Sequence, residues 1–387
     1  MSKNQNNRIS LSDKKNKEYR LIYKIIIDSI KKTNLDLTGL NVLTEAATGY
    51  WAYTPIIAFL ANASSVTCIT KNTKYGTTKE IIQNFSDLNK FFNFNEKIKI
   101  YKKLNKKILK NIDIITNSGH VRPINHSLLQ HIKHTAVVAL MWEPWEFREE
   151  DIDIRYCFKN GICVLGTNED NSKLNILNHC GELILKISKL TKTEFKNKKI
   201  IMVAENKTAI HMIESLKLQT KSIFYISKNF KNSLLKNHAN VIGESIEDPS
   251  IIPYLKDCDV LIINSAPSKK VIIGENGISP LLLKKLSPNL RIIVFFGKVD
   301  FNAINCSGIQ CYPKKSPPGD HMEWNFDILE HTPTIQLAVV GLKSVEDLAK
   351  LRKSGLTIDD SIQKSLKNKF CLDFSKKQKK EFTKSST

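Results

Sequence analysis

The chain has 387 residues and a mass of 44.1 kDa, a length that predicts two or three domains. Hydrophobic residues make up 41% and charged residues 25%, as in ordinary globular proteins, which excludes a fibrous or wholly disordered chain. No apolar run approaches the roughly 18 residues of a membrane-spanning helix, so we expect no membrane contact. The formal net charge of +21 suggests a polyanionic partner, unless it reflects a general excess of lysine.

Much of the positive charge lies at the two ends of the chain. Residues 1–32 contain nine basic and three acidic residues, and residues 364–387 contain eight and two. Their polar composition predicts disordered basic tails over 1–16 and 371–387. Because Lys outnumbers Arg and no element combines clustered Arg with aromatic residues, we expect no specific nucleic-acid partner.

The start of the chain is polar and lacks the apolar segment of a secretory signal. The eight cysteines form no Cys-x-x-Cys pair, and most lie in or beside apolar, strand-like runs. We therefore expect a cytoplasmic protein with reduced thiols and no metal site.

An alternation of helices and strands begins near the N-terminus. Residues 17–32 carry apolar side chains at the spacing of an amphipathic helix. A strand over 41–44, a helix over 55–62 capped by Thr54, and a strand over 65–70 then form a β-α-β unit, which is the building block of a parallel sheet. The first domain continues with strands over 97–101, 112–116, 136–141 and 162–166, and with helices over 77–84, 125–131, 149–160 and 174–190.

A second alternating series starts at residue 199. It predicts strands over 200–204, 223–227, 260–264 and 291–296, a short strand at Val241, and helices over 208–218, 233–238, 249–255 and 280–286. A last helix over 345–352 returns to the first domain. This pattern predicts an α/β fold of two Rossmann- or flavodoxin-like, doubly wound parallel-sheet domains around a cleft. The predicted domains cover 17–190 and 191–330, followed by a C-terminal segment over 331–370.

Three stretches of the chain carry a family resemblance. Residues 151–168 place an Asp before a short helix and then Gly-Ile-Cys-Val before an Asn; residues 260–267 end in Asn-Ser-Ala-Pro; residues 291–300 form an apolar strand. Over 132–301 the chain thereby resembles the D-isomer-specific 2-hydroxyacid dehydrogenase superfamily, with its formate/glycerate dehydrogenase-like fold. The resemblance implies an NAD(P)-dependent oxidoreductase acting on a small anionic substrate, and a homodimer.

The chain departs from the family at its functional motifs. The glycine-rich turn that lets a backbone approach a pyrophosphate is replaced after strand 200–204 by Glu-Asn-Lys-Thr, without glycine. The family's Arg would fall near Lys298, and its His would fall at Thr334. These replacements predict an atypical active site.

The resemblance places the cofactor at the strand ends of the second domain. An NAD site normally carries an acid after the second strand, whereas this chain has Ser227-Lys228, which favours NADP over NAD. The alternative is that Lys228 is an ordinary surface lysine. The candidate cofactor-binding residues are Ala204, Glu205, Asn206, Lys207, Thr208, Ser227, Lys228, Asn264, Ser265 and Pro267.

Two loops of the first domain are candidate substrate sites. Gly49, Tyr50 and Trp51 follow the first strand, where small residues admit a ligand and aromatic rings offer stacking faces; a packed aromatic elbow is the alternative. His120 and Arg122 follow the strand over 112–116. An Arg can clamp a carboxylate or phosphate and a His can act as acid or base, whereas a structural pairing of Arg122 with an Asp is the alternative.

Other residues are candidates for acid–base chemistry. Glu143 and Glu146 lie beside two tryptophans, which predicts a raised pKa or, alternatively, an interface hairpin. The proline-rich loop over 312–324 carries His321 and Glu323, which we assign as catalytic candidates together with Lys298. Two other functions stay open: an S-adenosylmethionine- or nucleotide-sugar-dependent enzyme, and a non-catalytic ligand-binding protein on the same fold.

Overall fold

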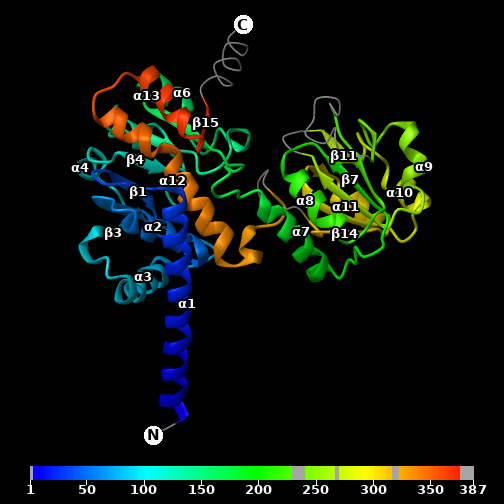
Figure 1. Cartoon of the computed structure of the whole chain (residues 1–387), viewed down its shortest axis with the longest axis horizontal. Coiled ribbons are helices and arrows are strands. Elements are labelled where there is room, and N and C mark those ends of the chain that lie inside the picture. The colour runs from blue at the N-terminus through cyan, green and yellow to red at the C-terminus, as the bar shows by residue number, and fades with distance from the viewer. Residues whose placement is uncertain (1–2, 229–239, 266–269, 316–321, 375–387) are drawn as a thin grey trace. The chain divides into compact units, whose positions relative to one another are not determined.

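The computed structural model describes residues 3–228, 240–265, 270–315 and 322–374, which form two compact units (Figure 1). Unit 1 comprises residues 1–176 and 330–387, and unit 2 comprises residues 177–329. Each unit contains one large, mainly parallel sheet, which confirms the predicted α/β class. The helix predicted over 233–238 lies outside the described residues.

Unit 1 is built on a seven-stranded sheet with the strand order β15-β6-β5-β4-β1-β2-β3. All neighbouring strands are parallel except β15 and β6. The central strands are buried along their length, because helices cover both faces of a parallel sheet. The strands are β1 (Asn41–Glu45), β2 (Ser65–Ile69), β3 (Ile98–Tyr101), β4 (Ile114–Thr116), β5 (Val137–Ala139), β6 (Cys163–Thr167) and β15 (Cys371–Asp373).

The longest helices of unit 1 are α1 (Lys3–Thr33) and α12 (His331–Lys353), which lie side by side (Figure 1). Lys343 Nζ of α12 donates to the carbonyl oxygen of Asn34, the residue after α1, over 3.0 Å. The other helices are η1 (Gly49–Tyr53), α2 (Thr54–Leu60), α3 (Thr78–Phe92), η2 (Asn95–Lys97), α4 (Lys106–Leu109), α5 (His126–Leu129), η3 (Pro144–Glu146), α6 (Ile154–Lys159), α13 (Ile358–Ser365) and η7 (Leu366–Asn368).

Both predicted disordered tails contain described residues that belong to regular elements. Helix α1 begins at Lys3 and contains neither Gly nor Pro, so that no helix breaker separates residues 3–16 from the amphipathic part. At the other end, β15 pairs antiparallel with Leu165–Thr167, and residues 371–373 therefore extend the sheet. Helix α12 also begins earlier than the predicted helix over 345–352.

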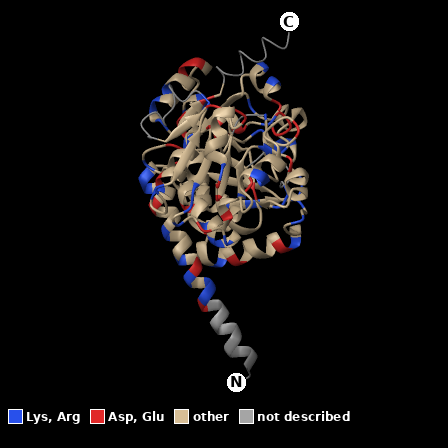
Figure 2. Ribbon diagram, turned by 90° about the vertical axis from the view of Figure 1, so that its right-hand side faces the viewer, with Lys and Arg blue, Asp and Glu red and all other residues tan. Residues whose placement is uncertain are grey.

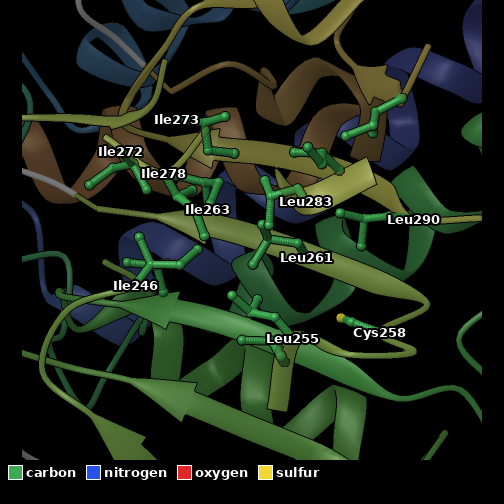
Figure 3. Packing of buried hydrophobic residues seen from close by; sticks show 14 of the residues in the cluster. Ile246, Leu255, Cys258, Leu261, Ile263, Ile272, Ile273, Ile278, Leu283 and Leu290 are labelled. Carbon is green, nitrogen blue, oxygen red and sulfur yellow. The ribbon is translucent and has the colours of Figure 1, made fainter. Parts of the chain in front are cut away.

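Unit 2 is built on a six-stranded parallel sheet with the order β14-β12-β10-β7-β8-β9, beside a two-stranded pair, β11 and β13. Isoleucine, leucine and valine side chains fill the core beneath this sheet, and Figure 3 shows Leu261 and Ile263 of β10 among them. The strands are β7 (Ile200–Ala204), β8 (Ile223–Ile226), β9 (Val241–Gly243), β10 (Val260–Asn264), β11 (Val271–Ile273), β12 (Arg291–Phe296), β13 (Lys298–Val299) and β14 (Gln310–Tyr312).

The helices of unit 2 include α7, which the sequence assigned to the first domain. Gly181 of α7 lies so close to α8 that a Cβ atom there would stand 2.7 Å from the carbonyl oxygen of His211. This close packing explains why α7 belongs to unit 2. The helices are α7 (Asn178–Thr191), α8 (Thr208–Lys217), η5 (Pro249–Ile251), α9 (Ile252–Leu255), α10 (Pro280–Leu286), α11 (Phe301–Cys306) and η6 (Phe326–Leu329).

Charged residues are spread over both units. Figure 2 shows Lys and Arg on many different elements, with Asp and Glu among them. In the part of the chain that the structure describes, no helix is long and apolar enough to cross a membrane.

Candidate functional site

Several buried polar side chains of unit 1 follow the carboxyl ends of its central strands. Glu45 ends β1, Asn117 and His120 follow β4, and Asp151 follows β5; each of these residues is less than a tenth exposed. Because β4 lies between β1 and β5, the parallel topology brings these loops to one edge of the sheet, where open α/β sheets bind ligands. We call the following residues the strand-end cluster: Glu45, Asn117, His120, Arg122, Arg148 and Asp151.

Glu45 and His120 form the first half of the strand-end cluster. The backbone N–H of His120 donates to Glu45 Oε2 over 2.9 Å. Gly119 permits this approach, since a Cβ there would lie 3.3 Å from the same oxygen. Burial raises the pKa of the Glu45 carboxyl, and the N–H of His120 opposes that rise. Burial and the N–H of His120 therefore act on the protonation of Glu45 in opposite directions.

Arg122 and Arg148 form the second half, around a single carboxylate. Arg122 Nη1 lies 3.5 Å and Arg148 Nη2 lies 3.1 Å from Asp151 Oδ2. The guanidinium carbon of Arg122 stands 4.6 Å from the centre of the Trp142 ring, a cation–π distance. Arg122 Nη2 also donates to the carbonyl oxygen of Asn117 over 3.2 Å. The pairing of Arg122 with an Asp, one of the two predicted roles, is thus confirmed.

This second half retains unused hydrogen-bonding capacity. Three groups are buried without a hydrogen-bond partner among the described residues: Arg122 Nε, Arg148 Nε and the side-chain amide of Asn117. Buried polar groups are normally paired with protein or water. The charges of Asp151 and Glu45 both act on Arg122, and the unused N–H groups of the two arginines can still donate hydrogen bonds to an anion.

Three further carboxyl groups follow the same strand ends: Glu143 and Glu146 after β5, and Glu169 after β6. Burial, followed by the charge of Glu143, raises the pKa of Glu146 to about 8. Burial and the charges of Glu146 and Glu143 raise the pKa of Glu169 well above its ordinary value. Trp145 Nε1 donates to Glu143 Oε2 over 2.8 Å. The raised pKa predicted for this pair of Glu residues is therefore found at Glu146, with burial rather than contact with Trp as its main cause.

The aromatic loop of unit 1 packs against α12. The ring of Tyr50 meets the ring of His331 edge-on with centroids 4.9 Å apart, and His331 Nε2 lies 3.5 Å from Glu18 Oε1. Gly49 is exposed with φ +60°, and Trp51 is half-buried. Tyr50 therefore takes the predicted role of a packed elbow. His331 was missed from the sequence, because the family pattern drew attention to Thr334.

In unit 2, the loop between β7 and α8 is closed by its own side chains. Asn206 Nδ2 donates to Asn264 Oδ1 over 3.2 Å, and Asn264 Nδ2 donates to Thr208 Oγ1 over 3.0 Å. Ser265 Oγ donates to Glu205 Oε2. The strand ends of β7 and β10 thus bring together five of the predicted cofactor residues, with Ala204 buried beneath them.

These residues do not fit a pyrophosphate at that position. A dinucleotide would place two phosphates against the backbone N–H groups of the loop and the start of α8. Here a Glu205 carboxylate is hydrogen-bonded at the strand ends, and side chains occupy the turn in place of glycine. The negative charge of Glu205 repels a phosphate, and the side chains of the turn fill the space that it would need.

The remaining predicted residues of unit 2 are dispersed. Ser227 is buried and its N–H donates to the carbonyl oxygen of Gly243 over 3.0 Å, whereas Lys207, Lys228 and Lys298 are exposed. The N–H of Glu323 donates to the carbonyl oxygen of Phe295 over 3.0 Å. Pro267 and His321 lie outside the described residues.

A cavity of about 570 Å³ lies elsewhere in unit 2, at the amino ends of β10, β12 and β14. Its lining includes Lys198, which forms an ion pair of 2.9 Å with Asp259. Ligands of open α/β sheets bind at the carboxyl ends of the strands, so this cavity is on the wrong edge for the predicted chemistry. In the described part of the chain, no group of three or more His, Cys, Asp or Glu side chains is arranged to hold a metal ion.

Comparison with known proteins identifies the fold. No protein-family model and no curated protein sequence matches the chain. A dipicolinate synthase chain from Bacillus subtilis is similar in structure, with a TM-score of 0.54 at 10% identity over 84% of this chain and 100% of the other. The corresponding dipicolinate synthase chain from Bacillus halodurans gives a TM-score of 0.52 at 10% identity, with coverages of 79% and 96%.

A third solved structure is less similar. A protein from Ralstonia solanacearum described as a D-3-phosphoglycerate dehydrogenase gives a TM-score of 0.43 at 9% identity, over 85% of this chain and 99% of the other. The assignment of the fold rests on the two dipicolinate synthase structures. At such low identity the likeness confirms a two-domain, Rossmann-like α/β fold and does not extend to activity.

Proposed function

We propose that the protein is an enzyme of the oxidoreductase type, related to the 2-hydroxyacid dehydrogenases, that binds a small anionic substrate at the strand-end cluster of unit 1. The observation that carries this proposal is the sharing of Asp151 by two mostly buried guanidinium groups, those of Arg122 and Arg148. A carboxylate or phosphate of the substrate would accept hydrogen bonds from their unused donors.

The family resemblance supplies the redox partner of this proposal, a nicotinamide dinucleotide, with NADP favoured over NAD by Lys228. The loop over 205–208 does not fit its pyrophosphate in the usual position, because Glu205 and the side chains of the turn occupy that place. We therefore assign no step of a reaction to the cofactor.

A second candidate function has its own supporting observation. The hydrogen bond between Ser265 and Glu205 closes the place where a dinucleotide would bind. A chain that kept the fold and the anion site but lost the cofactor would be a non-catalytic ligand-binding protein. Both candidate proteins would bind the anion, and only the enzyme would also bind a dinucleotide.

Isothermal titration calorimetry separates these candidates. The ligands are dipicolinate, inorganic phosphate, NADP, NADPH, NAD, NADH and S-adenosylmethionine, each at up to about 1 mM, the upper end of ordinary Michaelis constants. The proposed enzyme binds dipicolinate or phosphate together with a dinucleotide, and NADP more tightly than NAD. Binding of the anion alone would favour the non-catalytic protein. Failure of both anions to bind would contradict the anion site that the two candidates share.

A further inference from the structure

The two ring nitrogens of His120 have different surroundings. Nδ1 lies 2.9 Å from the carbonyl oxygen of Ala46 and 3.4 Å from the backbone nitrogen of Lys71. A carbonyl oxygen only accepts hydrogen bonds, so the shorter contact requires that Nδ1 carries the proton. The neutral ring then keeps a lone pair on Nε2. Among the described residues, Nε2 forms no hydrogen bond.

This arrangement is that of a histidine held ready for proton transfer. The hydrogen bond to Ala46 fixes the ring and its tautomer, as a base requires when its second nitrogen acts on a ligand. His120 is 8% exposed, so the ring is held within the fold rather than free to turn in solvent. The backbone of His120 is fixed as well, through its N–H bond to Glu45.

The charged groups around His120 come from three segments. Glu45 ends β1, Lys71 follows β2, and Arg122 lies on the same loop as His120. The charges of His120 and Arg122 both act on Glu45 and lower its pKa against the effect of burial. The Glu45 carboxyl accepts from the backbone N–H of His120, so the loop that carries the ring is anchored to the end of β1.

We infer that His120 is the acid–base residue of the strand-end cluster, with Arg122 two residues away holding the anionic group of the same ligand. The inference rests on the anion site proposed above. Nε2 takes a proton from an O–H or C–H group of the ligand; the N–H bond forms as the O–H or C–H bond breaks, and the electron pair stays on the ligand. The resulting imidazolium returns the proton in the reverse or following step.

The first test reads the tautomer directly. Long-range ¹H–¹⁵N NMR of the full chain, labelled at histidine, gives the protonation of both ring nitrogens, and the spectrum of His120→Asn assigns the His120 signals. The inference predicts a proton on Nδ1 and a bare Nε2 near pH 8, where an ordinary imidazole is neutral. A neutral ring protonated on Nε2 would overturn it, whether or not any anion binds.

The second test reads proton uptake on binding. Calorimetric titration of dipicolinate near pH 7 in two buffers of different ionisation enthalpy gives the number of protons bound with the ligand. An anion beside Nε2 raises the pKa of the ring, so the wild-type chain takes up a fraction of a proton. This uptake disappears in His120→Asn, which keeps a donor for Ala46, and in His120→Gln, and it persists in the control His126→Gln at an exposed position.

The outcomes separate this inference from the proposed function. Dipicolinate binding with the same proton uptake in wild type and His120→Asn would overturn the role of His120 and leave the anion site intact. Absence of binding by the wild-type chain would remove the anion site, and with it the ligand on which the acid–base role depends. With a substrate in hand, the loss of Nε2 lowers kcat by about 10²- to 10⁴-fold and changes KM little.

Discussion

Arg122 Nη1 lies 3.5 Å from Asp151 Oδ2, the same oxygen that stands 3.1 Å from Arg148 Nη2. One carboxylate thus serves two guanidinium groups on the loops after β4 and β5. The arrangement holds both cations near the carboxyl ends of the strands, where the charge of Glu45 also acts on Arg122. The proposed anion site rests on this relationship, in which Asp151 holds both arginines in place.

Replacing Asp151 by Asn should destabilise the fold and strengthen anion binding. The change removes the carboxylate that two mostly buried cations share, which costs about 3 kcal/mol of the free energy of unfolding. Urea denaturation with and without dipicolinate measures both effects, since a bound anion restores part of the loss. Asp13→Asn, at an exposed position, is the control. Equal stability of Asp151→Asn and wild type would contradict the shared-carboxylate account.

Replacing Glu205 by Gln tests why the loop of unit 2 does not fit a dinucleotide. Gln keeps the size of the side chain and removes its negative charge. If the charge opposes the pyrophosphate, the affinity for NADP should rise about tenfold, the effect of removing roughly 1.4 kcal/mol of repulsion. Calorimetry of wild type, Glu205→Gln and the control Glu244→Gln measures it. Unchanged affinity would leave the occupied turn, rather than the charge, as the obstacle.

Stability should fall as the pH rises through the range in which Glu146 titrates. Its pKa is about 8 in the folded chain and near 4.5 when unfolded, so the folded state holds the extra proton between these values. The folded state therefore loses stability from about pH 4.5 to 8, by an amount of the order of 2 kcal/mol, given the partial exposure of the residue.

Substitution of Glu146 by Gln isolates this contribution. The variant should show a flatter dependence of the urea midpoint on pH between 5.5 and about 8, because it no longer releases a proton. Glu149→Gln, an exposed neighbour, should keep the slope of the wild type. A wild-type slope in Glu146→Gln would place the proton on another group.

Glu346 joins α12 to the loop that follows α1. Its carboxylate accepts from Lys343 Nζ (2.8 Å), Lys350 Nζ (2.9 Å) and the N–H of Asp36 (3.1 Å), and both Glu346 and Lys343 are buried. Glu346→Ala should lower the free energy of unfolding by about 3 kcal/mol, because it strands the buried ammonium group of Lys343. A loss below 1 kcal/mol in thermal or urea unfolding would show that water replaces the carboxylate.

The fold could be predicted well from the sequence because its signal is local. Apolar runs such as residues 41–44 and 260–264 mark strands, and β1 and β10 follow them closely. The predicted domain boundary was wrong where it depended on packing between helices. Helix α7 belongs to unit 2 because Gly181 allows it to pack closely on α8. Likewise, residues 371–373 became a strand only because β6 offers an unpaired edge.

The candidate site was harder to predict from the sequence. His120 and Arg122 were recognised because they follow a strand, where ligands bind in parallel sheets. Arg148 and Asp151 were missed as partners of Arg122, since the pairing joins loops about 30 residues apart. Glu45 could have been recognised from the sequence, because it is an acidic residue at the end of an apolar strand. If that strand is central, the acid must be buried and paired. The filling of the turn over 205–208 by Asn264 and Ser265 also depends on contacts distant in sequence.

The most direct test of the central claim is calorimetric titration of dipicolinate, and separately of inorganic phosphate, into wild type, Arg122→Gln and Arg20→Gln. Arg20 is an exposed residue of α1, so its substitution controls for the loss of one positive charge. The account predicts that Arg122→Gln weakens binding of the anion by about 10- to 100-fold, the worth of a charge-assisted hydrogen bond, while Arg20→Gln binds like wild type. Equal affinities in all three proteins would contradict an anion site at the strand-end cluster.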